Sequence, residues 1–357
     1  MFKLALSALI SLLFAMTPAE AAKVEQRGSS ATVKKQVVKK STAKKSRYKR
    51  RDAVAKRVTV TTRDKSVRRV ITVRGKRKVV YQRFASAAPI IRSMTAGDKA
   101  GLNLTRDPLD LASSVALVLD QTNSEVLFEK NSGVALPIAS ITKLMTGLIV
   151  VEAQQDMDEM LTVTDDDVDR EKFTTSRLRV GSRLSRREML HIALMSSENR
   201  AAAALGRNYP GGIQGFVAAM NVKAHELGMS DTRYVDSSGL SSRNVASARD
   251  LAKLVMAAHQ QPLLREFSTD PGSAVAANGR LVQYRNTNYL VSLPDWDIGL
   301  QKTGFINEAG RCLVMQTIIQ GRAVIMVFLD SKGKQSRTAD AGRMRRWLEA
   351  LKPPGLS

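Results

Sequence analysis

Cysteine and histidine are scarce in this sequence. Among 357 residues there is one cysteine, Cys312, and there are three histidines. A single cysteine excludes an internal disulfide, and its apolar neighbours favour a small buried side chain. His225 is followed by Met229 where a zinc-peptidase helix requires a second histidine. We therefore expect no metal site and no cofactor.

Two other common signatures are also missing. The sequence has no Gly-x-Ser-x-Gly turn, with which α/β-hydrolases present a nucleophilic serine. It has no glycine-rich loop that would bind phosphate. After the first 21 residues, no apolar run is long enough to cross a bilayer. The chemistry must therefore come from other residues.

Acidic residues are rare in one part of the chain only. The formal net charge is +23. Residues 23–84 hold 23 Lys and Arg against 3 Asp and Glu, whereas residues 85–357 hold 32 against 29. A strongly basic leader therefore precedes a nearly balanced domain, and the net charge indicates nothing about the chemistry of that domain.

The N-terminus is typical of a secretory signal peptide. Lys3 precedes an apolar run over residues 4–16, and Ala19-Glu20-Ala21 matches the small-residue cleavage pattern. We expect residues 1–21 to be removed and the protein to act in the periplasm, with no transmembrane anchor after cleavage. The alternative is an uncleaved anchor. Because the protein is exported, we expect no nucleic-acid partner for the basic leader.

Residues 22–110 are predicted to form a basic, largely disordered leader and linker. The composition of 22–56 buries too little apolar surface to offset chain entropy. Near 67–81 an alternating pattern predicts a hairpin. The positive charge suits peripheral attachment to an anionic envelope surface, either membrane or cell wall. The alternative is a solvated spacer.

Residues 111–351 are predicted to form the catalytic domain, followed by a short tail at 352–357. Hairpins at both ends of the domain and helices between them predict an antiparallel sheet with helices packed on it, an α+β arrangement. The acidic run 165–167 is expected to be a solvated turn. Strands are expected at 114–119, 125–128, 161–163, 298–304, 311–319 and 323–329. Helices are expected at 137–155, 185–195, 213–227, 248–259 and 338–351. A further, alanine-rich helix is expected to end at 205.

Ser140 and Lys143 lie three residues apart at the predicted start of the helix 137–155. Residues with this spacing share one face of a helix, so a hydroxyl lies beside an amine. Free N–H groups at a helix start can stabilise an oxyanion, and a nearby amine can act as a base. The pair is not specific by itself, because the same spacing recurs at Ser41/Lys44, Ser46/Lys49 and Ser331/Lys334.

Two further polar clusters follow in order. Ser197 and Asn199 lie in a turn after an amphipathic helix, although the same spacing recurs at 242–244. We prefer 197–199 because a turn at a helix end can project its side chains into a cleft. Lys302-Thr303-Gly304 occurs once, at the edge of a predicted strand. Its glycine leaves room for a peptide-like substrate to lie along that strand.

The three clusters together are typical of penicillin-binding proteins and class A β-lactamases. Over residues 111–350 the sequence resembles this serine acyltransferase family, and the low-molecular-mass penicillin-binding proteins in particular. The stretches 174–178, 194–202 and 302–305 resemble the D-alanyl-D-alanine endopeptidase branch. The resemblance implies a β-lactamase/DD-peptidase-like fold, an antiparallel five-stranded sheet flanked by helices plus a mainly helical subdomain.

Two features depart from the family pattern. The chain ends soon after the last predicted helix. We therefore do not expect the second β-rich domain and C-terminal membrane-binding helix of the carboxypeptidase branch. The basic leader is not part of the family pattern either.

Chemistry and the resemblance together assign the residues of the acylation step. Ser140 would be the nucleophile and Lys143 the general base. Burial and the like charge of Lys302 would lower the pKa of Lys143 toward the range that a base needs. Ser197 would relay a proton to the leaving amine, and Asn199 would hold Lys143 and the substrate amide.

The remaining candidates would bind the substrate. Lys302 and Thr303 suit a substrate carboxylate, beside Gly304. The resemblance implies that the backbone N–H groups of Ser140 and Phe305 form the oxyanion hole.

The predicted function is a periplasmic serine DD-peptidase that cleaves D-alanyl bonds in peptidoglycan stem peptides through an acyl-enzyme on Ser140. The endopeptidase reaction is slightly favoured over the carboxypeptidase reaction, and β-lactams are expected as covalent inhibitors. A serine β-lactamase is one alternative, although the Glu-x-x-Leu-Asn-type segment of class A enzymes is absent after Ser197. The other alternative is a non-catalytic cell-wall-binding protein that acts through its basic leader.

Overall fold

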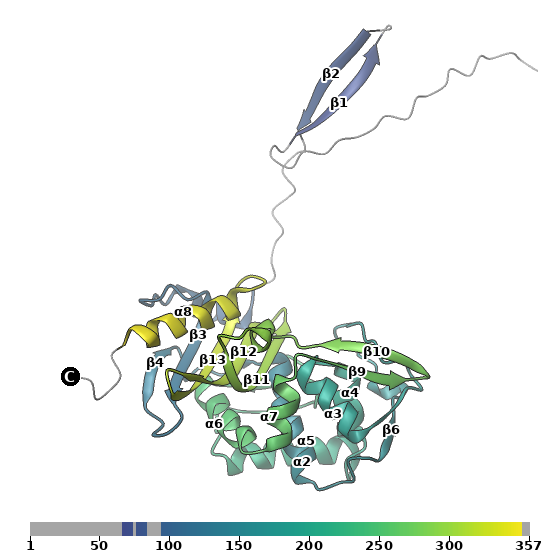
Figure 1. Ribbon diagram of the computed structural model, residues 1–357, viewed down its shortest axis with the longest axis vertical. Helices are drawn as coiled ribbons and strands as arrows, with labels where there is room; N and C mark the ends of the chain where they lie inside the picture. Colours follow the sequence, from purple (N-terminus) through teal and green to yellow (C-terminus); the bar gives the residue numbers. More distant parts are fainter. Residues whose placement is uncertain (1–65, 74–75, 84–93, 352–357) are drawn as a thin grey trace, which may run out of the picture. The chain divides into compact units, whose positions relative to one another are not determined.

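The computed structural model describes residues 66–73, 76–83 and 94–351 (Figure 1). The chain divides into one unit up to Ala87 and a second from Ala88 onward. In the first unit, strands β1 (Ser66–Val73) and β2 (Lys76–Arg83) pair antiparallel, where the sequence predicts a hairpin. The predicted signal peptide, the segment 22–65 and the tail 352–357 lie outside the described residues.

The second unit is organised around an antiparallel sheet of five strands, which confirms the predicted fold class. The strand order is β11-β12-β13-β3-β4, so β11 lies at one edge. Strands from the start of the domain therefore pair with strands from its end. The five are β3 (Ser113–Asp120), β4 (Val126–Lys130), β11 (Asp297–Ile306), β12 (Gly310–Ile319) and β13 (Arg322–Ser331).

Both faces of this sheet are covered, because successive residues of a strand point to opposite sides. Ala116 and Val118 of β3 share an apolar cluster with Met344 of helix α8 (Ser336–Ala350). Val115 and Leu117 belong to a larger cluster with the helical half of the domain. Every residue of β3 is buried. In Figure 1, α8 lies on one side of the sheet and α6 and α7 on the other.

The helical half of the domain packs around α2, which is buried along most of its length. Helix α3 begins with a capping box, because the Ser185 hydroxyl accepts from the Glu188 N–H and the Glu188 carboxylate accepts from the Ser185 N–H. The helices are α2 (Thr142–Glu152), α3 (Arg186–Met195), α4 (Asn199–Arg207), α5 (Gly212–Glu226), α6 (Ala248–His259) and α7 (Pro262–Thr269).

The segment 94–110, expected to be linker, is part of the domain. It contains helix α1 (Ala96–Lys99) and the turn η1 (Leu102–Leu104). The Ala96 N–H donates to the carbonyl oxygen of Glu308 at 2.8 Å. A helix of one turn shows no apolar periodicity, so the pattern that predicts longer helices could not find it.

The helix expected from Pro137 begins five residues later. Leu136–Pro137 form a short strand, β5, that pairs with β8 (Val245–Ala246). Ala139 has φ +48°, a left-handed conformation that an α-helix does not contain. Ser140 therefore lies on the 3₁₀ turn η2 (Ala139–Ile141), directly before α2.

Two small sheets complete the domain. One pairs β6 (Met160–Thr162) with β7 (Arg183–Ser185), and the other pairs β9 (Gly272–Ala277) with β10 (Arg280–Arg285). The sequence prediction missed α7, the β9–β10 hairpin and the turn η4 (Tyr289–Ser292). The alanine-rich strand β9 has one β-branched residue, Val275, and no aromatic one, so it carries little of the composition that favours strands.

The acidic run forms the 3₁₀ turn η3 (Asp165–Asp167), and the expectation of a solvated turn is wrong for one residue of it. Asp167 is buried, and its carboxylate accepts two hydrogen bonds from the guanidinium of Arg207, at 3.0 and 2.9 Å. Within the described residues, no helix has the length and apolar character needed to span a membrane.

Candidate active site

Ser140 lies where two backbone segments approach its turn closely. A Cβ on Gly304 of β11 would lie 2.8 Å from the carbonyl oxygen of Ile138 and 3.2 Å from the Ser140 nitrogen. Gly239 has φ +81°, and a Cβ there would lie 2.9 Å from the same nitrogen. Because neither residue carries a side chain, strand β11 and the turn before Gly239 can both reach Ser140.

Lys143 lies in the first turn of α2, with its side chain fully buried. Its Nζ donates to Ser140 Oγ at 2.9 Å and to Asn199 Oδ1 at 2.8 Å. A third bond goes to the carbonyl oxygen of Ser238, at 2.5 Å. The amine is therefore fixed beside the hydroxyl, as the sequence predicts for this pair.

Burial lowers the pKa of Lys143 to about 8. The negative charges of Asp236 and Glu198 oppose this shift. An amine with this pKa is partly neutral near pH 7 and can accept a proton from a hydroxyl within hydrogen-bond distance.

The turn between α3 and α4 brings Ser197 and Asn199 to the same place. Ser197 has φ +62°, an unusual conformation for a serine, of the kind found at functional sites. The Asn199 amide nitrogen donates to Thr174 Oγ1 at 3.0 Å while its oxygen accepts from Lys143. The pair at 242–244 does not meet this cluster, because Asn244 is fully buried and its amide nitrogen donates to Thr142 Oγ1.

Lys302 enters the cluster from β11, also fully buried. Its Nζ donates to Ser197 Oγ at 3.0 Å and to the carbonyl oxygen of Thr303 at 2.9 Å. Burial holds the pKa of Lys302 well below its usual value, and the positive charges of Lys143 and Arg337 lower it further. The site therefore contains two amine–hydroxyl pairs, one for each lysine.

The other residues predicted on β11 lie along the edge of the cleft. Thr303 is buried, with its Oγ1 2.6 Å from Thr287 Oγ1. Phe305 is half exposed, and the guanidinium of Arg311 lies 4.5 Å from the centre of its ring. The Gly304 carbonyl oxygen accepts from Arg337 at 2.7 Å.

Sequence reasoning missed several residues of this site. Asp236 accepts from the N–H groups of Ser238 and Gly239, at 2.7 and 2.6 Å, and so shapes the turn whose carbonyl oxygen binds Lys143. The Asp-Ser-Ser-Gly sequence there is a turn signal that could have identified it. Arg337 and Thr287 have no comparable local signal, because only the fold brings them to β11.

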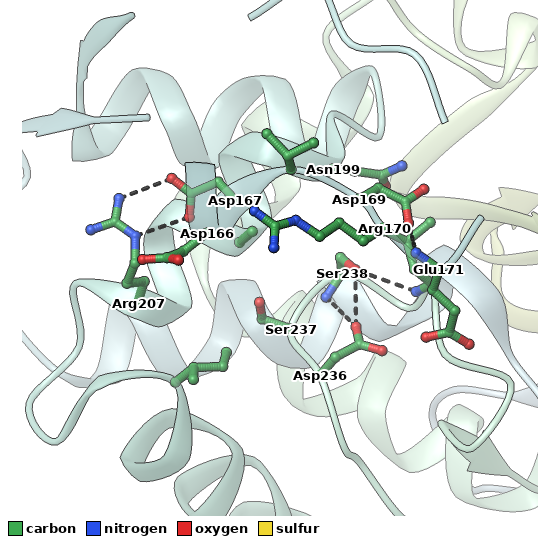
Figure 2. Close-up of a pocket in the computed structure, with 14 residues that line it drawn as sticks. Asp166, Asp167, Asp169, Arg170, Glu171, Asn199, Arg207, Asp236, Ser237 and Ser238 are labelled. Atoms are coloured by element: carbon green, nitrogen blue, oxygen red, sulfur yellow. Dashed lines mark hydrogen bonds and ion pairs between the residues drawn. The ribbon is translucent and has the colours of Figure 1, made fainter. Parts of the chain in front are cut away.

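A pocket of about 350 Å³ opens beside the cluster (Figure 2). Asn199 and Ser238 belong to its lining. Within the described residues no group of three or more His, Cys, Asp or Glu could hold a metal ion. What the geometry offers is a serine nucleophile, an amine base and a second amine–hydroxyl pair, which suits acyl transfer.

The D-alanyl-D-alanine carboxypeptidase family, peptidase S11, matches residues 103–333. The chain belongs to this family. Two relatives of this S11 peptidase are D-alanyl-D-alanine endopeptidases. The one from Pseudomonas aeruginosa is 51% identical over 70% of this chain and 81% of its own length. The one from Escherichia coli is 44% identical over 71% of this chain and 83% of its own length.

Solved structures share the fold of this S11 peptidase. The Streptomyces K15 DD-transpeptidase is 24% identical, with a TM-score of 0.63 over 69% of this chain and all of that one (100%). A D-alanyl-D-alanine carboxypeptidase from Mycobacterium tuberculosis is 24% identical, with a TM-score of 0.62 over 70% of this chain and 95% of that one. At this identity the likeness concerns the fold.

Proposed function

We propose that this S11 peptidase is a serine DD-peptidase that cleaves D-alanyl bonds in peptidoglycan stem peptides through an acyl-enzyme on Ser140. The bond of 2.9 Å from Lys143 Nζ to Ser140 Oγ carries this proposal, because it joins a nucleophile to a base with a pKa of about 8. The names of the two relatives favour the endopeptidase reaction, which cuts a crosslink between stems. The carboxypeptidase reaction is the second candidate, supported by the family description.

In the acylation step, Lys143 takes the proton of the Ser140 hydroxyl as Oγ attacks the carbonyl carbon of D-alanine. The carbonyl oxygen becomes an oxyanion held by the N–H groups of Ser140 and Phe305. The close approach of Gly304 to the Ser140 nitrogen supports this arrangement. The C–N bond then breaks, and Ser197 Oγ passes a proton to the leaving amine. Lys302, charged while a substrate carboxylate is bound, replaces the Ser197 proton across 3.0 Å. Lys143 releases to solvent the proton it took from Ser140, and Lys302 regains one from solvent, so that both lysines return to their starting forms before deacylation.

In the deacylation step, water attacks the ester carbonyl carbon while Lys143 accepts its proton. The ester C–O bond breaks, and the proton returns to Ser140 Oγ. The stem leaves as a carboxylic acid. The net reaction is hydrolysis of one amide bond, so no co-reactant other than water is needed.

Strand β11 has the groups to orient the substrate. Lys302 and Thr303 suit a substrate carboxylate, and a bound carboxylate would favour the charged form of a lysine that burial otherwise disfavours. The edge position of β11 lets a stem peptide add as a further strand. Asn199 accepts a hydrogen bond from Lys143 and also lines the pocket in Figure 2, where it can meet the substrate amide.

The compartment and the inhibitors belong to the same proposal. The signal sequence supports export to the periplasm, and the basic leader supports attachment to an anionic envelope surface. β-Lactams would acylate Ser140 because they present a strained amide to the same nucleophile.

Labelling with a fluorescent penicillin tests the proposal. Ser140→Ala should neither label nor cleave crosslinked muropeptides, whereas the matched control Ser242→Ala should do both like the parent. If Ser140→Ala labels as well as the parent, the proposal is wrong. Rapid turnover of penicillin would favour a β-lactamase instead. Monomeric muropeptides as products indicate an endopeptidase, and free D-alanine a carboxypeptidase.

A further inference from the structure

Two segments beside the active site carry arginines and no acidic residue. Residues 172–187 and 271–294 contain neither Asp nor Glu. Besides Arg177, four exposed arginines in them have no ion-pair partner within the described part of the chain. We call Arg179, Arg183, Arg280 and Arg285 the arginine face.

The two segments lie against each other. Arg177 Nη1 donates to the carbonyl oxygen of Gln283 at 2.7 Å, and its guanidinium lies 5.1 Å from the centre of the Tyr284 ring. Nearer the hairpin turn, Asn278 Nδ2 donates to Ser182 Oγ at 3.2 Å. The β9–β10 hairpin and the segment before β7 therefore form one continuous surface, which lies beside α3 in Figure 1.

Both segments are joined to the catalytic cluster. Ser176 Oγ donates to Glu198, in the turn that carries Ser197, at 2.6 Å. After the end of β10, Thr287 Oγ1 lies 2.6 Å from Thr303 Oγ1. The two segments that carry the arginine face therefore extend from the catalytic cluster.

Apolar side chains interrupt the positive charge of this face. Val180 is 43% exposed and Leu281 is 67% exposed. A ligand that matches the face carries carboxylates spaced among small apolar groups. A peptidoglycan strand has this composition, because its stem peptides combine alanine methyl groups with free carboxylates. An anionic membrane also has both components, but it would not enter the cleft that the face adjoins.

We propose that the arginine face binds carboxylates of the peptidoglycan strand next to the bond being cut. A soluble muropeptide lacks the neighbouring stems, so the face acts on the polymer only. This inference rests on the proposed function, since it takes that polymer as the substrate. The attraction is between exposed charges, so it weakens when salt screens them.

The test compares two full-length triple variants with equal loss of charge. The first, R179S/R280S/R285S, removes three arginines of the face. The control, R106S/R233S/R346S, removes three exposed arginines of other elements. Each is measured for co-sedimentation with purified insoluble peptidoglycan, for kcat/KM on that polymer and on a soluble crosslinked muropeptide, and for co-sedimentation with vesicles containing an anionic phospholipid.

The first variant should bind the insoluble polymer about tenfold more weakly than the parent, a difference that about 0.5 M salt removes. Its kcat/KM on the polymer should fall by the same factor as its binding, while its kcat/KM on the soluble muropeptide should equal that of the parent. Unchanged polymer binding, or an equal loss in the control, would overturn the inference. Loss of vesicle binding alone would assign the face to a membrane. Polymer binding does not depend on turnover. It therefore remains informative even if every protein lacks peptidase activity, a result that would refute only the proposed function.

Discussion

Lys143 and Lys302 enter the catalytic cluster from two elements, α2 and β11, which we call its two walls, and both are fully buried. On the wall of α2, the carboxylates of Asp236 and Glu198 partly offset the burial of Lys143, whose pKa is lowered to about 8. On the wall of β11, Lys302 has the positive charges of Lys143 and Arg337 near it instead, and its pKa is held well below the usual value. Burial is the main cause of both shifts, and the nearby charges weaken it for Lys143 and strengthen it for Lys302.

This difference suits two roles. Lys143 can switch between charged and neutral forms near physiological pH, as a base must. Among the described residues no anionic group adjoins Lys302. Under the proposed function a substrate carboxylate would supply one, so binding and charging of this lysine would be coupled. Substitutions in the two walls should therefore have different effects.

Replacing the α2-wall lysine should have the largest effect. Lys143→Ala removes the base beside Ser140, and the rate of acylation by penicillin should fall by about a thousandfold or more. The acylation rate is measured by labelling with a fluorescent penicillin, by stopped flow for the parent and by manual mixing for the slow variant. An acylation rate within tenfold of the parent would assign the base to another group.

Lys302→Ala should lower kcat/KM for acylation less with a neutral ester than with a substrate that bears the carboxylate. We expect kcat/KM for the carboxylate substrate to fall by about a hundredfold, because a charge-assisted contact and the partner of Ser197 Oγ are both lost. Comparing the two substrates separates these effects. Equal losses for both would mean that Lys302 does not bind the carboxylate.

The stability of the domain should be sensitive to one methyl group where β11 approaches the Ser140 turn. Gly304→Ala places a Cβ 2.8 Å from the Ile138 carbonyl oxygen, and should lower the free energy of unfolding by about 2 kcal/mol through overpacking. Gly133→Ala is the matched control, because a Cβ there meets nothing within 4 Å. Urea unfolding measures both. A Gly304→Ala protein as stable as the Gly133→Ala protein would contradict the close approach of β11 to the Ser140 turn.

The smallest effect is expected from removing one charge near Lys143. Glu198 raises the pKa of Lys143 by its negative charge, so Glu198→Gln should lower that pKa. The acid limb of the kcat/KM profile should then move to lower pH, by about one unit or less. A shift to higher pH, or none, would show that Glu198 does not act on Lys143 through its charge.

The sequence was informative where residues act through local spacing. Ser140, Lys143, Ser197, Asn199 and Lys302 were predicted from three short motifs, and the fold brings their side chains together. The capping box of α3 and the apolar strands β12 and β13 were predictable for the same reason, since spacing and periodicity are local properties.

What could not be predicted depends on distant residues. Ala139 takes a left-handed conformation because β5 and the Gly239 turn fix its surroundings, and this displaces the start of α2. Arg337 reaches Gly304 from the last helix, 33 positions along the chain. One-turn elements such as α1 are too short for any periodicity, and tertiary bonds hold them in place.

The account depends most on Lys143 being the titrating base of Ser140. The direct measurement is the rate constant for acylation of Ser140 by a penicillin as a function of pH, with the adduct located by mass spectrometry. The account predicts that the rate rises with pH through a pKa of about 8 and then levels off. A rate that does not change with pH across this range, or an adduct on another residue, would contradict it.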